Sequence, residues 1–262
     1  MNFDKPLIIA HRGASASAPE NTLAAFQHAI DDGADGIEFD VRLAKDIIPV
    51  VFHDSNLRRL AKINRRVADF TAEELGAINV GGWFNEAFPE RADRRFTAEK
   101  IPTLANLLKF LADYKGLIYI ELKGGAPVPT ALVKAVGELI ERTNLLPQII
   151  VQSFKLEAIK TVKQFLPEVR TAALFEPKVL TMLRKKKRIL EEAGKYQADE
   201  ISIHYSLATK KFVRRARENG FSTTIWTANS RVWVRHACEV GIGAIITDKP
   251  APLLAERDEM EI

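Results

Sequence analysis

Short apolar runs rich in β-branched residues alternate along the chain with longer segments in which apolar residues recur at helical spacing. The runs with strand character are Leu7–His11, Gly36–Val41, Leu117–Lys123, Ile149–Phe154, Thr171–Phe175, Glu200–Tyr205, Thr223–Thr227 and Ala244–Thr247. The segments with helical spacing are Asn21–Asp32, Thr103–Tyr114, Thr130–Thr143, Leu156–Phe165, Lys178–Ala193, Lys210–Asn219 and Arg231–Val240. This alternation predicts an α/β fold, and eight repeats over about 250 residues predict a closed (β/α)₈ barrel of the TIM type.

A ninth run, Ile47–His53, follows Val41 too closely to be another barrel strand. A parallel return needs a crossover of about a dozen residues or more, so this run must come back antiparallel. We expect the second barrel strand to pass the rim, turn at Lys45-Asp46 and fold back. The hairpin would return His53 to the mouth of the barrel.

We expect a single barrel domain over residues 1–262, in which residues 54–100 form a long insertion after this second strand. Ordinary loops in α/β units are short, so a segment of this length indicates a lid, a binding subregion or a small accessory unit. Its aromatic residues Trp83, Phe84 and Phe88 fit a small core of the insertion, with a wall of the substrate site as the alternative.

Composition narrows the choice of partner. Lys and Arg together number 38 and Asp and Glu 34, a net charge of +4 that favours an anionic substrate. The densest basic run, Arg184–Arg188, is typical of a solvated helix face and lacks the interleaved aromatic residues of a nucleic-acid module. We therefore expect a small-molecule partner and no nucleic acid. The single cysteine, Cys238, excludes an intrachain disulfide and is expected to be buried.

The start of the chain and its hydropathy suggest a location. The first strand begins at Leu7, which leaves no room before it for a signal peptide, and no apolar stretch is long enough to span a bilayer. We predict a soluble, cytoplasmic protein without a transmembrane segment. The oligomeric state is not predictable from the sequence.

Polar side chains gather at the ends of the first three predicted barrel strands. Side chains alternate along a strand, so residues two apart share a face, and the active sites of such barrels lie at the C-terminal strand ends. Glu38 and Asp40 share a face on the second strand, and Glu121 and Lys123 share one on the third. The residues expected at one mouth are His11, Arg12, Glu38, Asp40, His53, Glu121 and Lys123.

The three carboxylates Glu38, Asp40 and Glu121 would repel one another unless a cation lay among them. A divalent cation with all-oxygen ligands points to Mg²⁺ or Ca²⁺ rather than zinc. The alternative is a buried ion-pair network in which Lys123 and Arg12 neutralise the carboxylates.

His11 and His53 are suited to general acid–base catalysis near neutral pH. Such a pair can remove a proton from an attacking oxygen and supply one to a departing alkoxide, while a metal and Arg12 offset charge on an anionic substrate. A single strand histidine is commonly a core residue, but two at one mouth favour catalysis. The pattern leaves open whether His204, on the sixth strand, faces the pocket.

A series of short motifs, in this order along essentially the whole chain, resembles the glycerophosphodiester phosphodiesterase family. The motifs are His11-Arg12-Gly13, Pro19-Glu20-Asn21-Thr22, Glu38-Phe39-Asp40-Val41, His53-Asp54, Pro102-Thr103-Leu104, Glu121-Leu122-Lys123, Gln152-Ser153-Phe154, Trp226-Thr227-Ala228-Asn229 and Thr247-Asp248-Lys249-Pro250. The resemblance implies a divalent cation on the three carboxylates and catalytic roles for His11 and His53.

The resemblance also implies a substrate site. Its residues would be Arg12, Lys123, Glu20, Gln152 and Trp226, with Arg12 and Lys123 on the phosphoryl group and Trp226 packed near the substrate. Glu20 is expected to orient a histidine or an arginine rather than bind metal. Asn21 fits equally as a site residue and as the N-cap of the first helix, and Gln152 and Phe154 as pocket lining and as barrel core.

The sequence departs from the family after His53-Asp54, where Leu57–Ala61 replaces the usual pattern, which puts any substrate preference from the insertion in question. The resulting hypothesis is hydrolysis of a glycerophosphodiester to glycerol 3-phosphate and an alcohol. Its rivals are a lysophospholipase D acting on lipidated diesters and a non-catalytic phosphate-binding barrel. The leaving alcohol, the metal, the roles of the two histidines, and direct attack by water against a cyclic intermediate all stay open.

Overall fold

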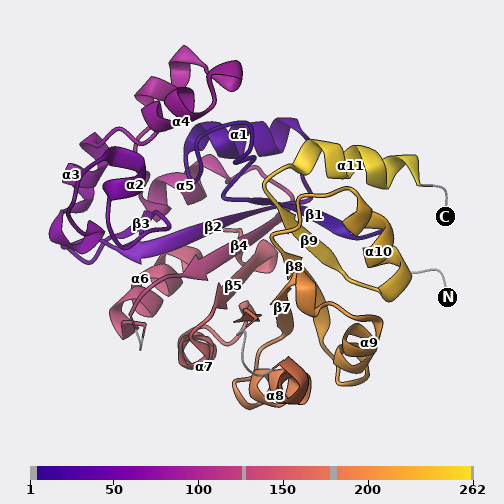
Figure 1. Ribbon diagram of the computed structural model, residues 1–262. Coiled ribbons are helices and arrows are strands. Elements are labelled where there is room, and N and C mark those ends of the chain that lie inside the picture. Colours follow the sequence, from indigo (N-terminus) through magenta and orange to yellow (C-terminus); the bar gives the residue numbers. More distant parts are fainter. Residues whose placement is uncertain (1–4, 126–127, 178–181, 261–262) are drawn as a thin grey trace.

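The structure is a computed structural model that describes residues 5–125, 128–177 and 182–260, with backbone alone for 182–187. Within these residues, eight parallel strands close into a barrel (Figure 1). They are β1 (Leu7–His11), β2 (Gly36–Leu43), β4 (Leu117–Leu122), β5 (Ile149–Ser153), β6 (Arg170–Phe175), β7 (Glu200–His204), β8 (Ser222–Trp226) and β9 (Ala244–Thr247). The ring closes where β1 pairs with both β9 and β2. The predicted barrel is confirmed.

Helices surround the strands as an outer layer (Figure 1). They are α1 (Leu23–Asp31), α5 (Leu104–Phe110), α6 (Thr130–Glu141), α7 (Leu156–Phe165), α8 (Met182–Lys195), α9 (Lys210–Glu218), α10 (Val232–Val240) and α11 (Pro250–Glu259). Each predicted helical segment overlaps one of these helices. Helix α8 extends beyond the predicted end at Ala193, and residues 178–181 of that segment lie outside the described residues. Helix α11 was missing from the prediction. Its first residue, Pro250, suits the first turn of a helix, where the N–H groups have no intrahelical acceptor.

The extra strand β3 (Pro49–Val51) pairs antiparallel with β2. Val51 lies opposite Val41, and the N–H of Phe52 donates to the carbonyl of Asp40 over 2.9 Å. The predicted hairpin is therefore confirmed, and it returns the chain to the level of Asp40 on β2.

The turn of this hairpin holds Ile47 at φ 66°, a left-handed conformation that β-branched residues rarely adopt. Its side chain is 57% exposed, so little burial offsets the strain. We expect Ile47→Gly to stabilise the protein by up to about 1 kcal/mol, because relief of about 1–2 kcal/mol of strain exceeds the added entropy of the unfolded chain. The measurement is the midpoint of urea unfolding. Ile48→Gly, outside the left-handed region, is the control and should destabilise; a lower midpoint for Ile47→Gly would contradict the explanation.

The predicted insertion holds three short helices and several 3₁₀ turns. The helices are α2 (Arg58–Ala61), α3 (Ala72–Ala77) and α4 (Gly82–Ala87). Phe84 and Phe96 are buried here with ring centroids 5.6 Å apart, and Trp83 packs on Phe84 at 5.7 Å. These aromatic residues form a small core, as in the first of the two interpretations drawn from the sequence. This core also includes Ala18 and Ala25, so it joins the insertion to α1.

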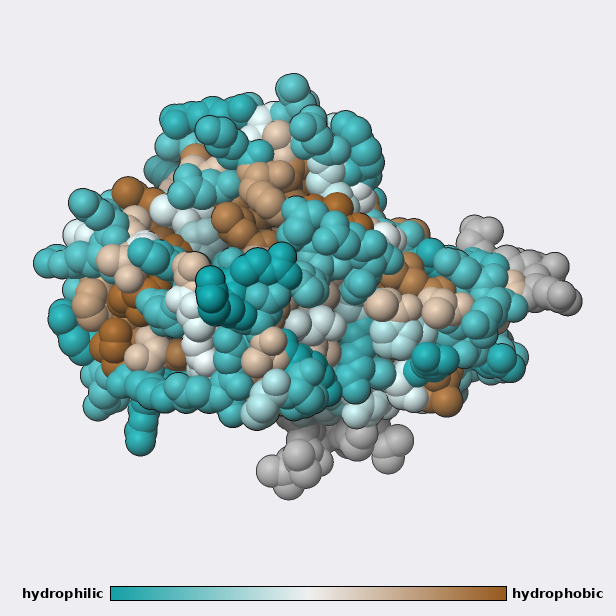
Figure 2. All heavy atoms as spheres, turned by 90° about the horizontal axis from the view of Figure 1, so that it is seen from above, coloured by the Kyte–Doolittle hydropathy of each residue, from teal (hydrophilic) through white to brown (hydrophobic). Residues whose placement is uncertain are grey.

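The surface is mixed in character. On the face seen in Figure 2, hydrophobic side chains lie in separate groups among hydrophilic ones. The basic run predicted on a helix face falls in α8, where Arg188 is exposed, and Cys238 is half-buried rather than buried. None of the helices in the described part of the chain has both the length and the hydropathy needed to cross a bilayer.

Candidate active site

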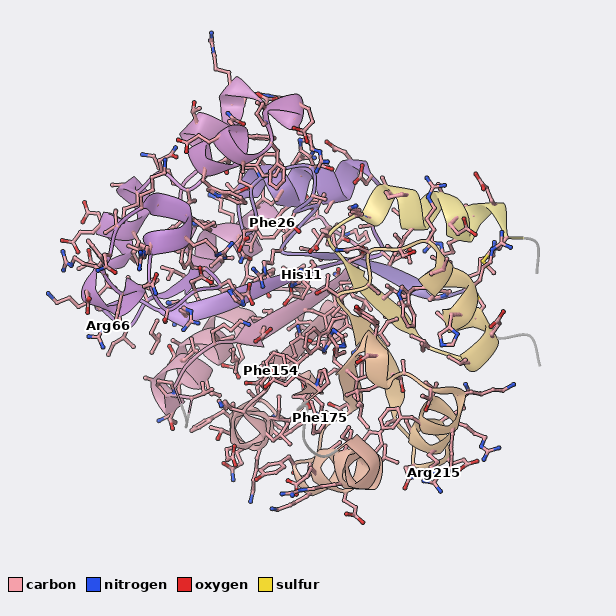
Figure 3. All side chains as sticks on the ribbon, viewed as in Figure 1. His11, Phe26, Arg66, Phe154, Phe175 and Arg215 are labelled. Carbon is pink, nitrogen blue, oxygen red and sulfur yellow. The ribbon has the colours of Figure 1, made fainter. Side chains whose placement is uncertain are left out.

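Strand register brings the predicted acidic residues together at the C-terminal end of the barrel. His11, the last residue of β1, is the register partner of Glu38 on β2. Asp40 is the partner of Glu121 on β4, and Glu121 is the partner of Gln152 on β5. Figure 3 shows His11 near the centre of the strands, far from labelled surface residues such as Arg66. These residues share one site because neighbouring parallel strands present matching positions to one face.

The three carboxylates form a compact buried cluster. Among the described residues, Glu38, Asp40 and Glu121 each offer one oxygen, and these oxygens lie within 4.8 Å of one another. Asp40 Oδ1 is buried and, within the described residues, makes no hydrogen bond. Three buried carboxylate oxygens at this spacing fit a divalent cation with oxygen ligands.

Two cationic side chains lie against this cluster. Lys123 Nζ is 2.5 Å from Glu121 Oε1 and 3.2 Å from Asp40 Oδ1, while Arg12 Nε is 3.2 Å from Asp40 Oδ2. These contacts resemble the ion-pair network that the sequence offered as the alternative to a metal site. Two positively charged side chains do not neutralise three carboxylates, however, so the cluster keeps room for a further cation.

The pKa values of Asp40 and Glu121 shift in opposite directions. Burial works to raise the pKa of Asp40, but the charges of Lys123 and Arg12 outweigh it and hold that pKa well below its usual range. Burial raises the pKa of Glu121 to about 8, with Asp40 and Glu38 adding to the rise and Lys123 opposing it. A carboxyl that would otherwise take up a proton at neutral pH is consistent with a site built for a further cation.

His11 is held by a carboxylate that the sequence analysis did not assign. Its Nδ1 lies 2.6 Å from Oδ1 of Asp248, which follows β9, and its Nε2 lies 3.9 Å from Glu38 Oε2. Burial opposes ionisation of Asp248, but hydrogen bonds from His11, Asn229 and Ser15 lower its pKa to about 2. Because Asp248 is an ionised acceptor, Nδ1 of His11 carries the donated proton and Nε2 is directed into the site.

The pKa of His11 reflects the same contacts. Burial by itself lowers it, but the hydrogen bond to Asp248 and the charge of Glu38 outweigh burial, so the pKa is raised.

His53 has a similar arrangement at the end of the hairpin. Its Nδ1 lies 2.7 Å from Asp54 Oδ1, and Asp54 accepts a second hydrogen bond of 2.7 Å from Arg59 Nε. Burial lowers the pKa of His53, with the charge of Asp40 opposing the change. Each imidazole is thus fixed through Nδ1 by a carboxylate, which leaves Nε2 for a ligand.

The turn after β1 places Arg12 over the cluster. Arg12 has φ 55°, and the following Gly13 has φ 81°, with no space for a side chain, since a Cβ would lie 2.5 Å from the backbone of Ala25. The backbone N–H of Arg12 donates to Glu38 Oε2 over 3.2 Å, and its guanidinium donates to Glu20 Oε1 over 2.8 Å. Glu20 therefore orients an arginine, as expected from the sequence.

Asn21 belongs to the site rather than to the helix cap. Its Nδ2 donates to Asp40 Oδ2 over 2.9 Å. The N-cap of α1 is Thr22, whose hydroxyl accepts from the N–H of Ala25. The alternative of an Asn21 cap was wrong because its left-handed backbone (φ 58°) turns the side chain to Asp40.

Aromatic side chains line the opposite part of the mouth. The ring of Trp226, at the end of β8, lies 5.3 Å from Phe154 and 5.4 Å from His204. Phe154 lies 5.7 Å from Lys123 Nζ, which connects this wall to the acidic cluster. Gln152 Nε2 donates to Glu38 Oε1 over 3.1 Å. Phe154 and Gln152 therefore line the site, and His204 lies beside it.

The predicted site residues lie at or just beyond the ends of neighbouring strands, but several of the residues that contact them carried no predicted role. Asp248 and Asn229 stand in two of the short motifs, yet no role was attached to them. Asn229 Nδ2 donates to Asp248 Oδ2 over 2.7 Å. Asp54 and Arg59 were also unassigned. The motifs were the available signal, and His53-Asp54 is a pair of neighbours in sequence. The contact between Asp248 and His11, in contrast, depends on barrel closure.

Comparisons with known proteins agree on one family. Residues 11–252 match the Glycerophosphoryl diester phosphodiesterase family. A glycerophosphodiester phosphodiesterase of Caldanaerobacter subterraneus subsp. tengcongensis is 31% identical over 250 residues, which cover 95% of this chain and 97% of that protein. One from Bacillus subtilis is 31% identical over 253 residues, covering 94% and 85%. The structure of an Oleispira antarctica phosphodiesterase in complex with the product sn-glycerol-3-phosphate superposes with a TM-score of 0.84 at 25% identity, covering 97% and 98%.

Proposed function

We propose that this chain, which belongs to the glycerophosphoryl diester phosphodiesterase family, hydrolyses glycerophosphodiesters to glycerol 3-phosphate and an alcohol by histidine acid–base catalysis on a divalent cation. The chain is an enzyme of the phosphoric diester hydrolase class. The observation that carries the histidine mechanism is the pair of imidazoles, each fixed at Nδ1 by a carboxylate, beside three clustered carboxylates.

Glu38, Asp40 and Glu121 would hold the divalent cation, for which Mg²⁺ and Ca²⁺ are the candidates. When bound, the cation supplies positive charge that offsets the negative charge developing on the phosphoryl oxygens. Arg12 and Lys123 lie against the same carboxylates, so their free N–H groups would contact the other non-bridging oxygens.

Proton transfer would run through the Nε2 atoms of His11 and His53. One neutral imidazole removes the proton from the attacking hydroxyl group as its oxygen bonds to phosphorus. The other, as imidazolium, gives a proton to the alcohol oxygen when its bond to phosphorus breaks. Asp248 and Asp54 stabilise the charged forms and fix both rings. The same pair serves attack by water and attack by a neighbouring glycerol hydroxyl.

The remaining predicted site residues would shape the substrate site. Trp226 and Phe154 offer an apolar wall for the carbon atoms of the substrate. Gln152 and Glu20 would orient other site residues rather than touch the substrate. Gln152 donates to Glu38, and Glu20 accepts from Arg12.

A substrate panel tests the function. We expect turnover of glycerophosphocholine, glycerophosphoethanolamine and glycerophosphoglycerol, with release of glycerol 3-phosphate measured by a coupled assay. Lysophosphatidylcholine should react more slowly, because Phe84 is buried in the local core of the insertion and is not available to hold an acyl chain. Faster turnover of the lysolipid would favour the lysophospholipase D alternative. Binding of diesters without turnover would favour a non-catalytic barrel.

Several sequence predictions stay predictions: a single domain over residues 1–262, a cytoplasmic location, and the absence of a nucleic-acid partner.

A further inference from the structure

Arg59, in the short helix α2 of the insertion, contacts two carboxylates from different parts of the chain. Its Nε donates to Asp54 Oδ2 over 2.7 Å. Its Nη1 and Nη2 donate to the two oxygens of Glu20 over 2.6 and 2.7 Å. One guanidinium therefore uses a single and a bidentate contact to join the loop before α1 to the end of the hairpin.

Each of these carboxylates holds a group to which the proposed function gives a role. Asp54 lies 2.7 Å from Nδ1 of His53, and Glu20 accepts from Arg12 over 2.8 Å. Arg12 in turn lies 3.2 Å from Asp40. The chain of contacts runs from the imidazole through Asp54, Arg59 and Glu20 to the guanidinium over the acidic cluster.

Arg59 differs from two other arginines of the insertion that form ion pairs with carboxylates. Arg66 and Arg95 pair with Asp69 and Asp93, which are three and two residues away and lie on the surface. Glu20, in contrast, is buried and lies 39 residues from Arg59 in sequence. Pairs at the surface contribute little to stability, whereas a planar fork between two carboxylates fixes their separation.

We infer that Arg59 is a positioning residue that sets the distance between His53 and Arg12, and so gives the insertion a part in the reaction. This inference rests on the proposed function. It predicts an effect on turnover larger than the effect on folding, because the Arg59 side chain is 44% exposed and its partners orient groups of the site.

The test compares Arg59→Ala with Arg58→Ala, a neighbour in the same helix that is also exposed. Turnover of glycerophosphocholine is measured with added Mg²⁺ or Ca²⁺. We expect Arg59→Ala to lower kcat by about 10- to 100-fold, as is usual when a supporting contact is removed, and Arg58→Ala to change it little. Added guanidinium, far below denaturing concentrations, should restore part of the activity of Arg59→Ala alone. Arg59→Lys should fall between, since an ammonium group lacks the fork.

Coupling gives a second readout. In an Asp54→Asn background, Arg59→Ala should lower kcat by a smaller factor than in the wild type. The contact of Arg59 with the Asp54 carboxylate, one of its two contacts, is already weakened there. Equal activity of the Arg58 and Arg59 variants would overturn the inference. So would a loss that accompanies a lower melting temperature and does not respond to guanidinium. The wild-type enzyme is assayed first: absence of diester turnover there refutes the proposed function, separately from any result on Arg59.

Discussion

Asp40→Asn is expected to reduce kcat/KM by about 10³-fold or more and to weaken metal binding. Asp40 lies at the centre of the acidic cluster, with one oxygen that makes no hydrogen bond within the described residues and with Lys123 and Arg12 on either side. An amide of the same shape removes the charge but keeps the packing. Loss of several kcal/mol of charge stabilisation corresponds to this factor in rate.

The measurement combines steady-state kinetics with calorimetric titration of Mg²⁺ and Ca²⁺. The matched control is Glu73→Gln, an exposed carboxylate in α3, which should leave both unchanged. A chelator should abolish turnover by the wild type, and the preferred cation should restore it. Activity that is insensitive to the chelator, together with unchanged metal titration in Asp40→Asn, would show that Lys123 and Arg12 neutralise the cluster without a metal.

The second large effect is expected for His11→Ala and His53→Ala. Each should lower kcat by about 10²- to 10⁴-fold, the usual contribution of a positioned acid or base. His236→Ala, on the outer helix α10, is the control and should retain activity. Loss in the double variant should be smaller than the product of the single losses, because the two imidazoles act in one reaction.

A change of leaving group separates the two roles. An acidic phenol departs without a proton, so the variant that lacks the acid should recover much of its rate on a p-nitrophenyl diester. The variant that lacks the base should remain slow. Recovery of neither would indicate that both histidines bind substrate instead, and rates near wild type for both on natural diesters would exclude the mechanism.

The pattern of apolar and polar residues along the chain determined the barrel and the face on which several site residues lie. Alternation of short apolar runs with helical segments is enough to predict a parallel barrel, since each element must bury its own apolar face. Two-residue spacing placed Glu38 and Asp40 on one face, and the short link after Val41 required an antiparallel hairpin that returns His53. These features depend only on strand periodicity and chain length, which are properties of neighbouring residues.

Tertiary structure alone decided the contacts between site residues that lie far apart in sequence. Asp248 reaches His11 across 237 residues only because β9 and β1 are paired where the ring closes. Arg59 meets Glu20 because α2 packs beside the loop before α1, and Thr22 rather than Asn21 caps that helix because Asn21 turns to Asp40. Such contacts depend on register and closure, so the sequence identified the candidate site residues and the fold determined how they are held.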